Sequence, residues 1–310
     1  MTCPCSSELG DPEHFIAFEE IEALVDHALE NQSPVKHVIL SGGEPTQHPR
    51  FWEVVDYLSR NKLSLGILTN GSGFTEPEAS ERLRDYFPPG SVHITTALHG
   101  NDAKQHDEMT GIPGSFSDTI TALCRLHENG IGFTVKYIAS KYTLPTLPAL
   151  SNDLLERFGT GFQMILCQID YCGRAWTNRE RLFVDYKTAS PVFGQVVDRF
   201  VSHFGNEARR HVRIYDTPFC AINFVYWPFL RQQEGNRLAG FYSPESPNEN
   251  RRTTGMQSVP QLTGTVFESC GRCGLREKCP GVWKSVQPLF SGDDFRPFIL
   301  STTGKTLVQQ

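Results

Sequence analysis

The fold is decided by the stretch Val35-Lys36-His37-Val38-Ile39-Leu40-Ser41-Gly42-Gly43-Glu44-Pro45, where a short apolar run stops at two glycines. Residues 36–41 are rich in Val, Ile and Leu, which is typical of a buried strand in a parallel sheet. The glycines permit backbone conformations that other residues avoid, and Pro45 stiffens the exit from the loop. Because ligands bind beyond the carboxyl ends of parallel strands, this loop is a candidate ligand site. Gly-Gly turns also occur for purely geometric reasons, so the motif alone identifies no ligand.

Length and charge restrict the class of protein. A chain of 310 residues can form one large α/β domain with an appendage. Its 29 Lys and Arg residues against 35 Asp and Glu residues give a net charge of -6 without a basic block, which argues against nucleic acid as the main partner. No apolar run is long enough to span a membrane, and no signal peptide is apparent at the amino terminus. We therefore predict a cytoplasmic protein without a membrane partner.

The nine cysteines are unevenly distributed along the chain. An odd number without a secretory signal favours metal binding or catalysis over a disulfide framework. Cys124 and Cys167 fit core positions in a predicted helix and a predicted strand. Cys172 follows that strand at its carboxyl end, where a role in a site is conceivable. The remaining six are Cys3, Cys5, Cys220, Cys270, Cys273 and Cys279.

Strand and helix patterns alternate over the first two thirds of the chain. The repeat of roughly thirty residues is the rhythm of βα units and indicates parallel strands. The predicted strands cover 36–41, 64–69, 91–98, 132–139 and 162–169, with a short one near 211–215. The predicted helices cover 15–30, 49–61, 77–86, 116–129, 147–157 and 189–204. No strand precedes the first helix, so we predict an α/β fold, a partial (β/α)6 TIM-like barrel that lacks its first strand.

The periodicity lapses after residue 205. We therefore predict a barrel over 1–205 and a small cysteine-rich region over 206–310, which includes the aromatic run Phe219 to Leu230 and a polar loop over 234–262. Segments with so few regular elements usually depend on a metal for rigidity.

The cysteines of the tail have the spacing of metal ligands. Cys270 and Cys273 form a CxxC pair, Cys279 follows after five residues, and Cys220 can supply a fourth thiolate. Four thiolates suit either a structural zinc ion or an iron-sulfur cluster, and the motif does not choose between these metals.

Several further motifs occur in one order over nearly the whole chain. They are Ser41-Gly42-Gly43-Glu44-Pro45-Thr46, His48-Pro49, Thr69-Asn70-Gly71, Leu98-His99-Gly100, His106-Asp107, Thr110-Gly111, Gly114-Ser115-Phe116 and Cys270-x2-Cys273-x5-Cys279-Pro280-Gly281. With these motifs the chain resembles the radical S-adenosylmethionine (SAM) superfamily, and its tail resembles the SPASM or twitch type of auxiliary-cluster extension.

The resemblance implies a cofactor set and a site. Such enzymes hold a [4Fe-4S] cluster by a CxxxCxxC loop after the first strand, and the open iron chelates SAM, which is split on reduction to give a 5'-deoxyadenosyl radical. It implies that Gly42, Gly43 and Glu44 bind the methionyl ammonium of SAM. Asn70 resembles the ribose-contacting position, although a turn residue would look the same. The implied ligands of a second, auxiliary [4Fe-4S] cluster are Cys220, Cys270, Cys273 and Cys279.

The amino terminus departs from the family pattern. Cys3 and Cys5 are separated by one residue, so they cannot be the last pair of CxxxCxxC. Cys3 matches the third cysteine, which would place the first two ligands and the first strand upstream of Met1. A truncated gene model, an internal start and a degenerate paralogue each explain this departure, and Cys5 is at best a substitute ligand.

Other residues have competing interpretations. Lys136 and Arg174 could hold a carboxylate or be ordinary surface charges. His99 and His106 could act as acid and base or serve loop packing. The aromatic run 219–229 could shield a cluster from water or belong to an ordinary core.

The sequence thus predicts a radical SAM enzyme, an oxidoreductase that modifies a peptide or protein side chain, because auxiliary clusters of this type accompany peptide maturases. The cofactor carries the radical step, and the protein orients the substrate and excludes water. A reductant such as flavodoxin or ferredoxin is an implied partner, and no catalytic residue is assigned. The alternative is a non-catalytic binding protein that has lost its catalytic cluster and keeps a structural metal in the tail.

Overall fold

The computed structural model describes residues 15–30, 35–171, 173–231, 267–279, 281–282, 286–291, 294–300 and 307–309. The predicted metal ligand Cys3 lies outside these residues, as do Cys5, Cys172 and the polar loop over 234–262.

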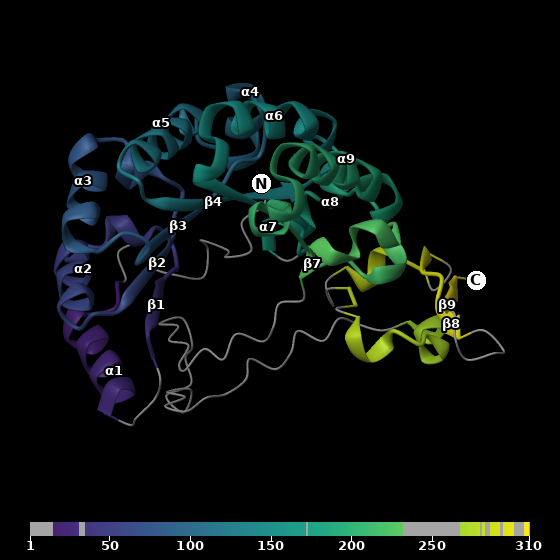
Figure 1. Ribbon diagram of the computed structural model, residues 1–310, viewed down its shortest axis with the longest axis horizontal. Helices are drawn as coiled ribbons and strands as arrows, with labels where there is room; N and C mark the ends of the chain where they lie inside the picture. Colours follow the sequence, from purple (N-terminus) through teal and green to yellow (C-terminus); the bar gives the residue numbers. More distant parts are fainter. Residues whose placement is uncertain are drawn as a thin grey trace.

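A curled sheet of seven parallel strands forms the centre of the fold. Its order follows the sequence from β1 to β7, so each strand pairs with the next one along the chain. The strands are β1 (His37–Leu40), β2 (Ser64–Leu68), β3 (Val92–Ala97), β4 (Gly132–Ala139), β5 (Phe162–Gln168), β6 (Val212–Tyr215) and β7 (Leu230–Arg231). The sheet is an open arc with the longer helices on its outer side (Figure 1). This arrangement confirms the predicted α/β partial barrel.

The outer helices follow the predicted positions to within a few residues. They are α1 (Phe18–Glu30), α2 (Phe51–Arg60), α3 (Pro77–Tyr86), α5 (Ser115–Glu128), α6 (Leu147–Phe158) and α9 (Tyr186–Phe204). The shorter helices are α4 (Ala103–Thr110), α7 (Gly173–Thr177), α8 (Arg179–Leu182) and α10 (Ala208–His211). None of the helices in the described part of the chain has the length and apolarity that crossing a bilayer requires.

The prediction that Pro49 lies in the first turn of α2 was wrong. A separate 3-10 turn, Pro45–Gln47, precedes the helix, and α2 begins only at Phe51. Between them the backbone N–H of Arg50 donates to Nδ1 of His48 at 3.0 Å. Because this bond fixes Arg50 at φ -110 and ψ 29, outside helical values, the helix starts two residues later than predicted.

Alternate strand residues face opposite sides of the sheet. Leu65, Ile94 and Phe133 are fully or almost fully buried in the core beneath the outer helices. Their neighbours in the chain, Gly66 and His93, lie in one register row on the concave side. In the described part of the chain, the longer helices cover the outer side of the sheet and leave its concave side uncovered by them (Figure 1).

The sheet continues past the predicted domain boundary at 205. Strands β6 and β7 extend it to Arg231, and β7 pairs with β6 through Leu230 and Arg231. The alternation of strand and helix patterns is hard to follow in this part of the sequence, because β6 has only four residues and β7 only two. The aromatic run forms two 3-10 helices, Phe219–Ala221 and Phe224–Phe229. The division into 1–205 and 206–310 stays a prediction.

The tail packs against the sheet's carboxyl edge through aromatic rings. Phe290 contacts Phe183 and Tyr186, with both pairs of ring centroids 5.4 Å apart, and Trp227 contacts Phe298 at 5.2 Å. Its elements are the 3-10 helices Glu268–Arg272, Arg276–Lys278 and Gln287–Leu289 and the antiparallel pair β8 (Phe298–Leu300) and β9 (Leu307–Gln309). The described tail thus lies beyond β7 (Figure 1).

Candidate functional site

The carboxylate of Glu44 joins the loops that follow β1 and β2. Its Oε2 accepts a hydrogen bond from the backbone N–H of Asn70 at 2.7 Å, and its Oε1 accepts one from the Thr69 hydroxyl at 2.7 Å. Oε1 also accepts from the backbone N–H and the hydroxyl of Thr46, at 3.1 and 2.6 Å. A charged acceptor with four donors holds the two loops in fixed relative positions.

This geometry changes the interpretation of Glu44. Oε1 already receives three hydrogen bonds, whereas Oε2 receives one and keeps a lone pair free. The structure therefore assigns Glu44 first to holding the loop, and its contact with the SAM ammonium stays a prediction. Thr46 and Thr69 were missed as its partners, although both lie in the quoted motifs.

The two glycines expose their backbone. Gly42 has φ +141, a conformation that favours glycine, and an added Cβ at Gly42 or Gly43 would have no described atom within 4 Å. Their carbonyl groups can therefore be approached closely at the sheet's carboxyl edge. Their role in SAM binding stays a prediction.

Asn70 has the geometry of a turn residue. Its Oδ1 accepts a hydrogen bond from the backbone N–H of Ser72 at 2.8 Å, and its carbonyl accepts one from the Thr119 hydroxyl at 3.2 Å. Gly71 follows with φ +91 and packs closely, because its Cβ position would lie 3.3 Å from Cβ of Ala122. A ribose contact by Asn70 stays a prediction beside this structural role.

His99 in the loop after β3 lies against His106 on α4. The backbone N–H of His99 donates to Nδ1 of His106 at 3.1 Å, and the rings stack with centroids 5.5 Å apart. Burial lowers the pKa of His99 to about 3 and that of His106 to about 4, so both rings are neutral near pH 7. Asp107 accepts backbone bonds from Gly114 and Phe116 and thereby ties α4 to α5. These contacts favour the loop-packing interpretation.

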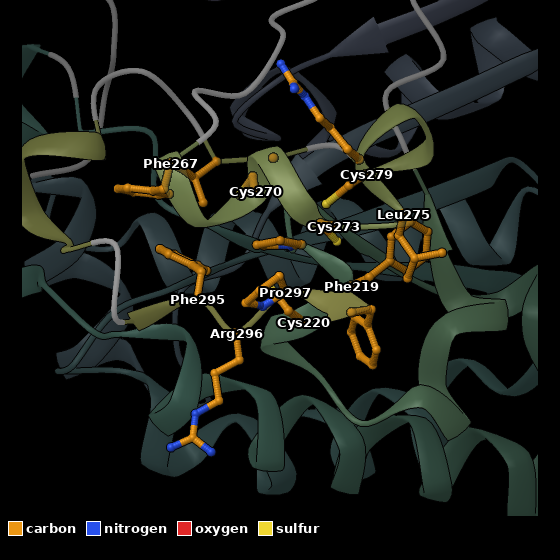
Figure 2. A pocket seen from close by; sticks show the side chains of 15 residues that line it. Phe219, Cys220, Phe267, Cys270, Cys273, Leu275, Cys279, Phe295, Arg296 and Pro297 are labelled. Atoms are coloured by element: carbon orange, nitrogen blue, oxygen red, sulfur yellow. The ribbon is translucent and has the colours of Figure 1, made fainter. Parts of the chain in front are cut away.

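The four cysteines predicted as a ligand set line one pocket in the tail. The empty volume of this pocket, which other residues also line, is about 490 Å³, including the part open to solvent. Figure 2 shows the thiols around the same space, with Phe267 and Phe295 on one side and Phe219 and Leu275 on the other. The predicted ligands that line it are Cys220, Cys270, Cys273 and Cys279, and their role as ligands stays a prediction.

The thiols of this pocket influence one another electrostatically. Burial, followed by the charges of the other three cysteines, raises the pKa of Cys220 to about 12. Burial also raises the pKa of Cys279, while backbone N–H groups of Gly281 and Phe219 partly offset this by stabilising its thiolate. A cationic centre bound in the pocket would remove this mutual repulsion, so the donor set fits a thiolate-ligated metal group.

The middle cysteines have structural positions. Cys167 is buried, and its thiol donates to the carbonyl of Tyr137 at 3.3 Å. Cys124 packs against the core from α5. Both observations agree with the interpretation of packed core thiols. The polar candidate Arg174 lies on α7, where its carbonyl accepts a bond from Asn178.

Comparison with known proteins identifies the family of the barrel. Residues 3–152 match the family model described as the radical SAM superfamily. The chain is 31% identical over 160 residues to the mycofactocin maturase MftC of Mycobacterium tuberculosis (strain ATCC 25618 / H37Rv), which covers 51% of this chain and 38% of that protein. It is 29% identical over 142 residues to the AdoMet-dependent heme synthase of Methanosarcina barkeri (strain Fusaro / DSM 804), covering 46% of this chain and 39% of that protein. The matched segments thus span about two fifths of these relatives.

Solved structures share the fold. Streptococcus suis SuiB bound to its precursor peptide SuiA has a TM-score of 0.54 and 13% identity, covering 96% of this chain and 71% of that chain. The structure of anSMEcpe with bound AdoMet has a TM-score of 0.53 and 18% identity, covering 69% and 59%. At these identities the likeness concerns the fold alone.

Proposed function

Residues 3–152 form a domain of the radical SAM superfamily, and from this premise we propose that the protein cleaves SAM reductively and modifies a peptide or protein side chain. The family match carries the proposal, because it includes the Gly42-Gly43-Glu44 loop at the sheet's carboxyl edge. The relative named as a mycofactocin maturase supports a peptide substrate. A flavodoxin or ferredoxin is the proposed electron donor.

The residues of the chain have the following roles in this proposal. A bound SAM with its [4Fe-4S] cluster supplies radical hydrogen abstraction. The carbonyl groups of Gly42 and Gly43 accept from the SAM ammonium, and Glu44 keeps their loop in place against β2. Asn70 borders the same site. Cys3, the proposed cluster ligand, belongs to the part of the chain outside the described residues.

We also assign the tail pocket to an auxiliary [4Fe-4S] cluster rather than to zinc. A zinc ion needs its thiolates about 2.3 Å from one point. Yet no group of three His, Cys, Asp or Glu side chains among the described residues has the spacing for one metal ion. A four-iron cluster binds one thiolate at each corner and therefore fits four cysteines around a wider space.

The test is SAM cleavage by the anaerobically reconstituted protein. The reading frame upstream of Met1 is sequenced first, so that the expressed protein includes any in-frame strand and Cys-x3-Cys segment. With dithionite and SAM, the proposal predicts release of methionine and 5'-deoxyadenosine, measured by chromatography. SAM left intact by protein with its iron loaded would contradict the proposal.

A second candidate function rests on the tail alone. The four tail cysteines line one pocket whatever the barrel binds, so a non-catalytic binding protein with one metal site in the tail is the alternative. A stop codon directly upstream of Met1, together with a single metal group and intact SAM, would support it.

A further inference from the structure

The inner wall of the barrel is basic. No Asp or Glu occurs in any of the seven strands of the described sheet, although the whole chain has a net charge of -6. The same strands contain Lys136, Arg213 and Arg231 together with His37 and His93. A group bound inside the curve of the sheet would meet these basic side chains and no acidic side chain from the strands.

Lys136 and Arg213 occupy one row of the concave side. Ile165 pairs with Lys136 on one flank and with Arg213 on the other. Neighbouring strands are about 4.8 Å apart, so the two backbones are separated by about 10 Å, a gap that two long side chains can close. Both residues are partly exposed, as expected for a wall without helices over it.

Neither cation has an acidic partner. No carboxylate of the described residues lies within ion-pair distance of Lys136 or Arg213, and Nε of Arg213 is buried without a hydrogen-bond partner. An unpaired guanidinium in a partly buried position is costly unless a ligand supplies the anion.

The alternation along the strands places both cations on the concave side. Lys136 lies between the buried Val135 and Tyr137 of β4, and Arg213 lies between the buried Val212 and Ile214 of β6. In agreement, Arg213 contributes to the lowered pKa of His93 on β3, after burial and His37. Lys136 contributes to the lowered pKa of His99, after burial and His106.

We propose that Lys136 and Arg213 bind a carboxylate of the peptide substrate, and that this carboxylate is either its carboxyl terminus or an acidic side chain. Charge-assisted hydrogen bonds suit this role, and the guanidinium can bind a carboxylate through two of them. The inference rests on the proposed function in that it takes the concave side as the substrate site.

Three pools of acetylated hexapeptides test the proposal. The first lacks Asp and Glu and has a free carboxyl terminus, the second is the same pool amidated, and the third is amidated with one Glu. Retention by the reconstituted, SAM-loaded protein is measured by ultrafiltration and mass spectrometry. We expect the first or the third pool to be retained about tenfold better than the second, and the better pool shows which carboxylate is bound.

Variants show which residues cause the preference. Lys136→Met and Arg213→Met should each abolish it, Lys136→Arg should keep most of it, and the outer-surface control Arg60→Met on α2 should leave it unchanged. Equal retention of all pools, or an unchanged preference in the Met variants, would disprove the proposal. Loss of SAM retention in these variants would assign the two cations to the carboxylate of SAM and would also overturn it.

The proposed function is tested separately by 5'-deoxyadenosine release without peptide. A protein that cleaves SAM but retains the pools equally disproves only the carboxylate site. A protein that leaves SAM intact but prefers carboxylates disproves only the proposed function.

Discussion

The loops at the ends of β1 and β2 and the pocket of the tail are stabilised in different ways. At the loops, one carboxylate receives four hydrogen bonds and needs no ligand to stay in place. In the tail, four partly buried thiols line one pocket, and the surrounding elements are short 3-10 helices. The first site is therefore formed by the chain itself, whereas we propose that the second depends on the group it binds.

The largest effect is expected from replacing two of the cysteines that are proposed to bind the cluster in the tail. Arg276 and Lys278 lie between Cys273 and Cys279, so a bound cluster should protect their peptide bonds from trypsin. In the Cys270→Ser/Cys273→Ser double variant we expect cleavage there to be about 100-fold faster, because metal binding and local folding are coupled. Anaerobic proteolysis followed by mass spectrometry measures the rate. The control variant Cys124→Ser, which also removes a thiol, should be cleaved as slowly as the unmodified protein. Equal cleavage rates in the unmodified protein, the double variant and the control would show that the tail does not depend on a bound group.

A smaller effect is expected from Gly71, which tests the loop after β2. Gly71→Ala places a Cβ at φ +91 and 3.3 Å from Cβ of Ala122. We expect the free energy of unfolding to fall by about 2 kcal/mol through backbone strain and crowding. Gly90 has φ +82 but open space around it, so Gly90→Ala isolates the strain and should cost about 1 kcal/mol. Urea unfolding compares the two, and identical losses would show that the loop is not tightly packed.

Glu44 tests whether the carboxylate links the loops. In Glu44→Gln an amide nitrogen can face the Asn70 N–H in place of Oε2. Leaving that donor unsatisfied should lower the free energy of unfolding by about 1.5 kcal/mol. Glu53→Gln, which removes only an exposed ion pair with Arg50, should change it by less than about 0.5 kcal/mol. If both substitutions had the same effect on urea unfolding, the loops would not depend on Glu44.

The smallest effect concerns pH. Burial lowers the pKa of His106 from 6.5 to about 4, so its contribution to stability is complete above pH 6.5 and decreases as the pH falls toward 4. Between pH 7 and pH 6 the barrel should lose about 0.7 kcal/mol through this residue. In His106→Asn that part of the loss should disappear, as measured by urea unfolding at both pH values. The control His203→Asn changes an exposed ring and should leave the pH dependence of the free energy of unfolding unchanged. If His106→Asn also left it unchanged, His106 would not be a buried neutral ring.

The sequence predicted the barrel well because its strands and helices are regular. The strand over 132–139 and the helix over 77–86 have the predicted bounds. The short strand β6 was predicted near 211–215, whereas the two-residue strand β7 fell below what periodicity detects. The start of α2 depended on a hydrogen bond from the Arg50 N–H to the His48 side chain.

The sequence also predicted some parts of the candidate sites better than others. The four tail cysteines were expected to lie together, and they line one pocket. The prediction was possible because the spacing of a CxxC pair is characteristic of metal ligands. The contacts of Glu44 with Thr69 and Asn70 join two separate loops, and Lys136 and Arg213 share a row only because both pair with Ile165; the three-dimensional structure is needed to show either relation.

Metal content of the tail tests the central claim most directly. Iron, sulfide and zinc are determined, with Mössbauer spectra, for the reconstituted protein and for Cys270→Ser/Cys273→Ser. The account predicts that the double variant loses about four irons and four sulfides per chain, the content of one [4Fe-4S] cluster. One zinc per chain in the unmodified protein, or equal iron in both proteins, would contradict it.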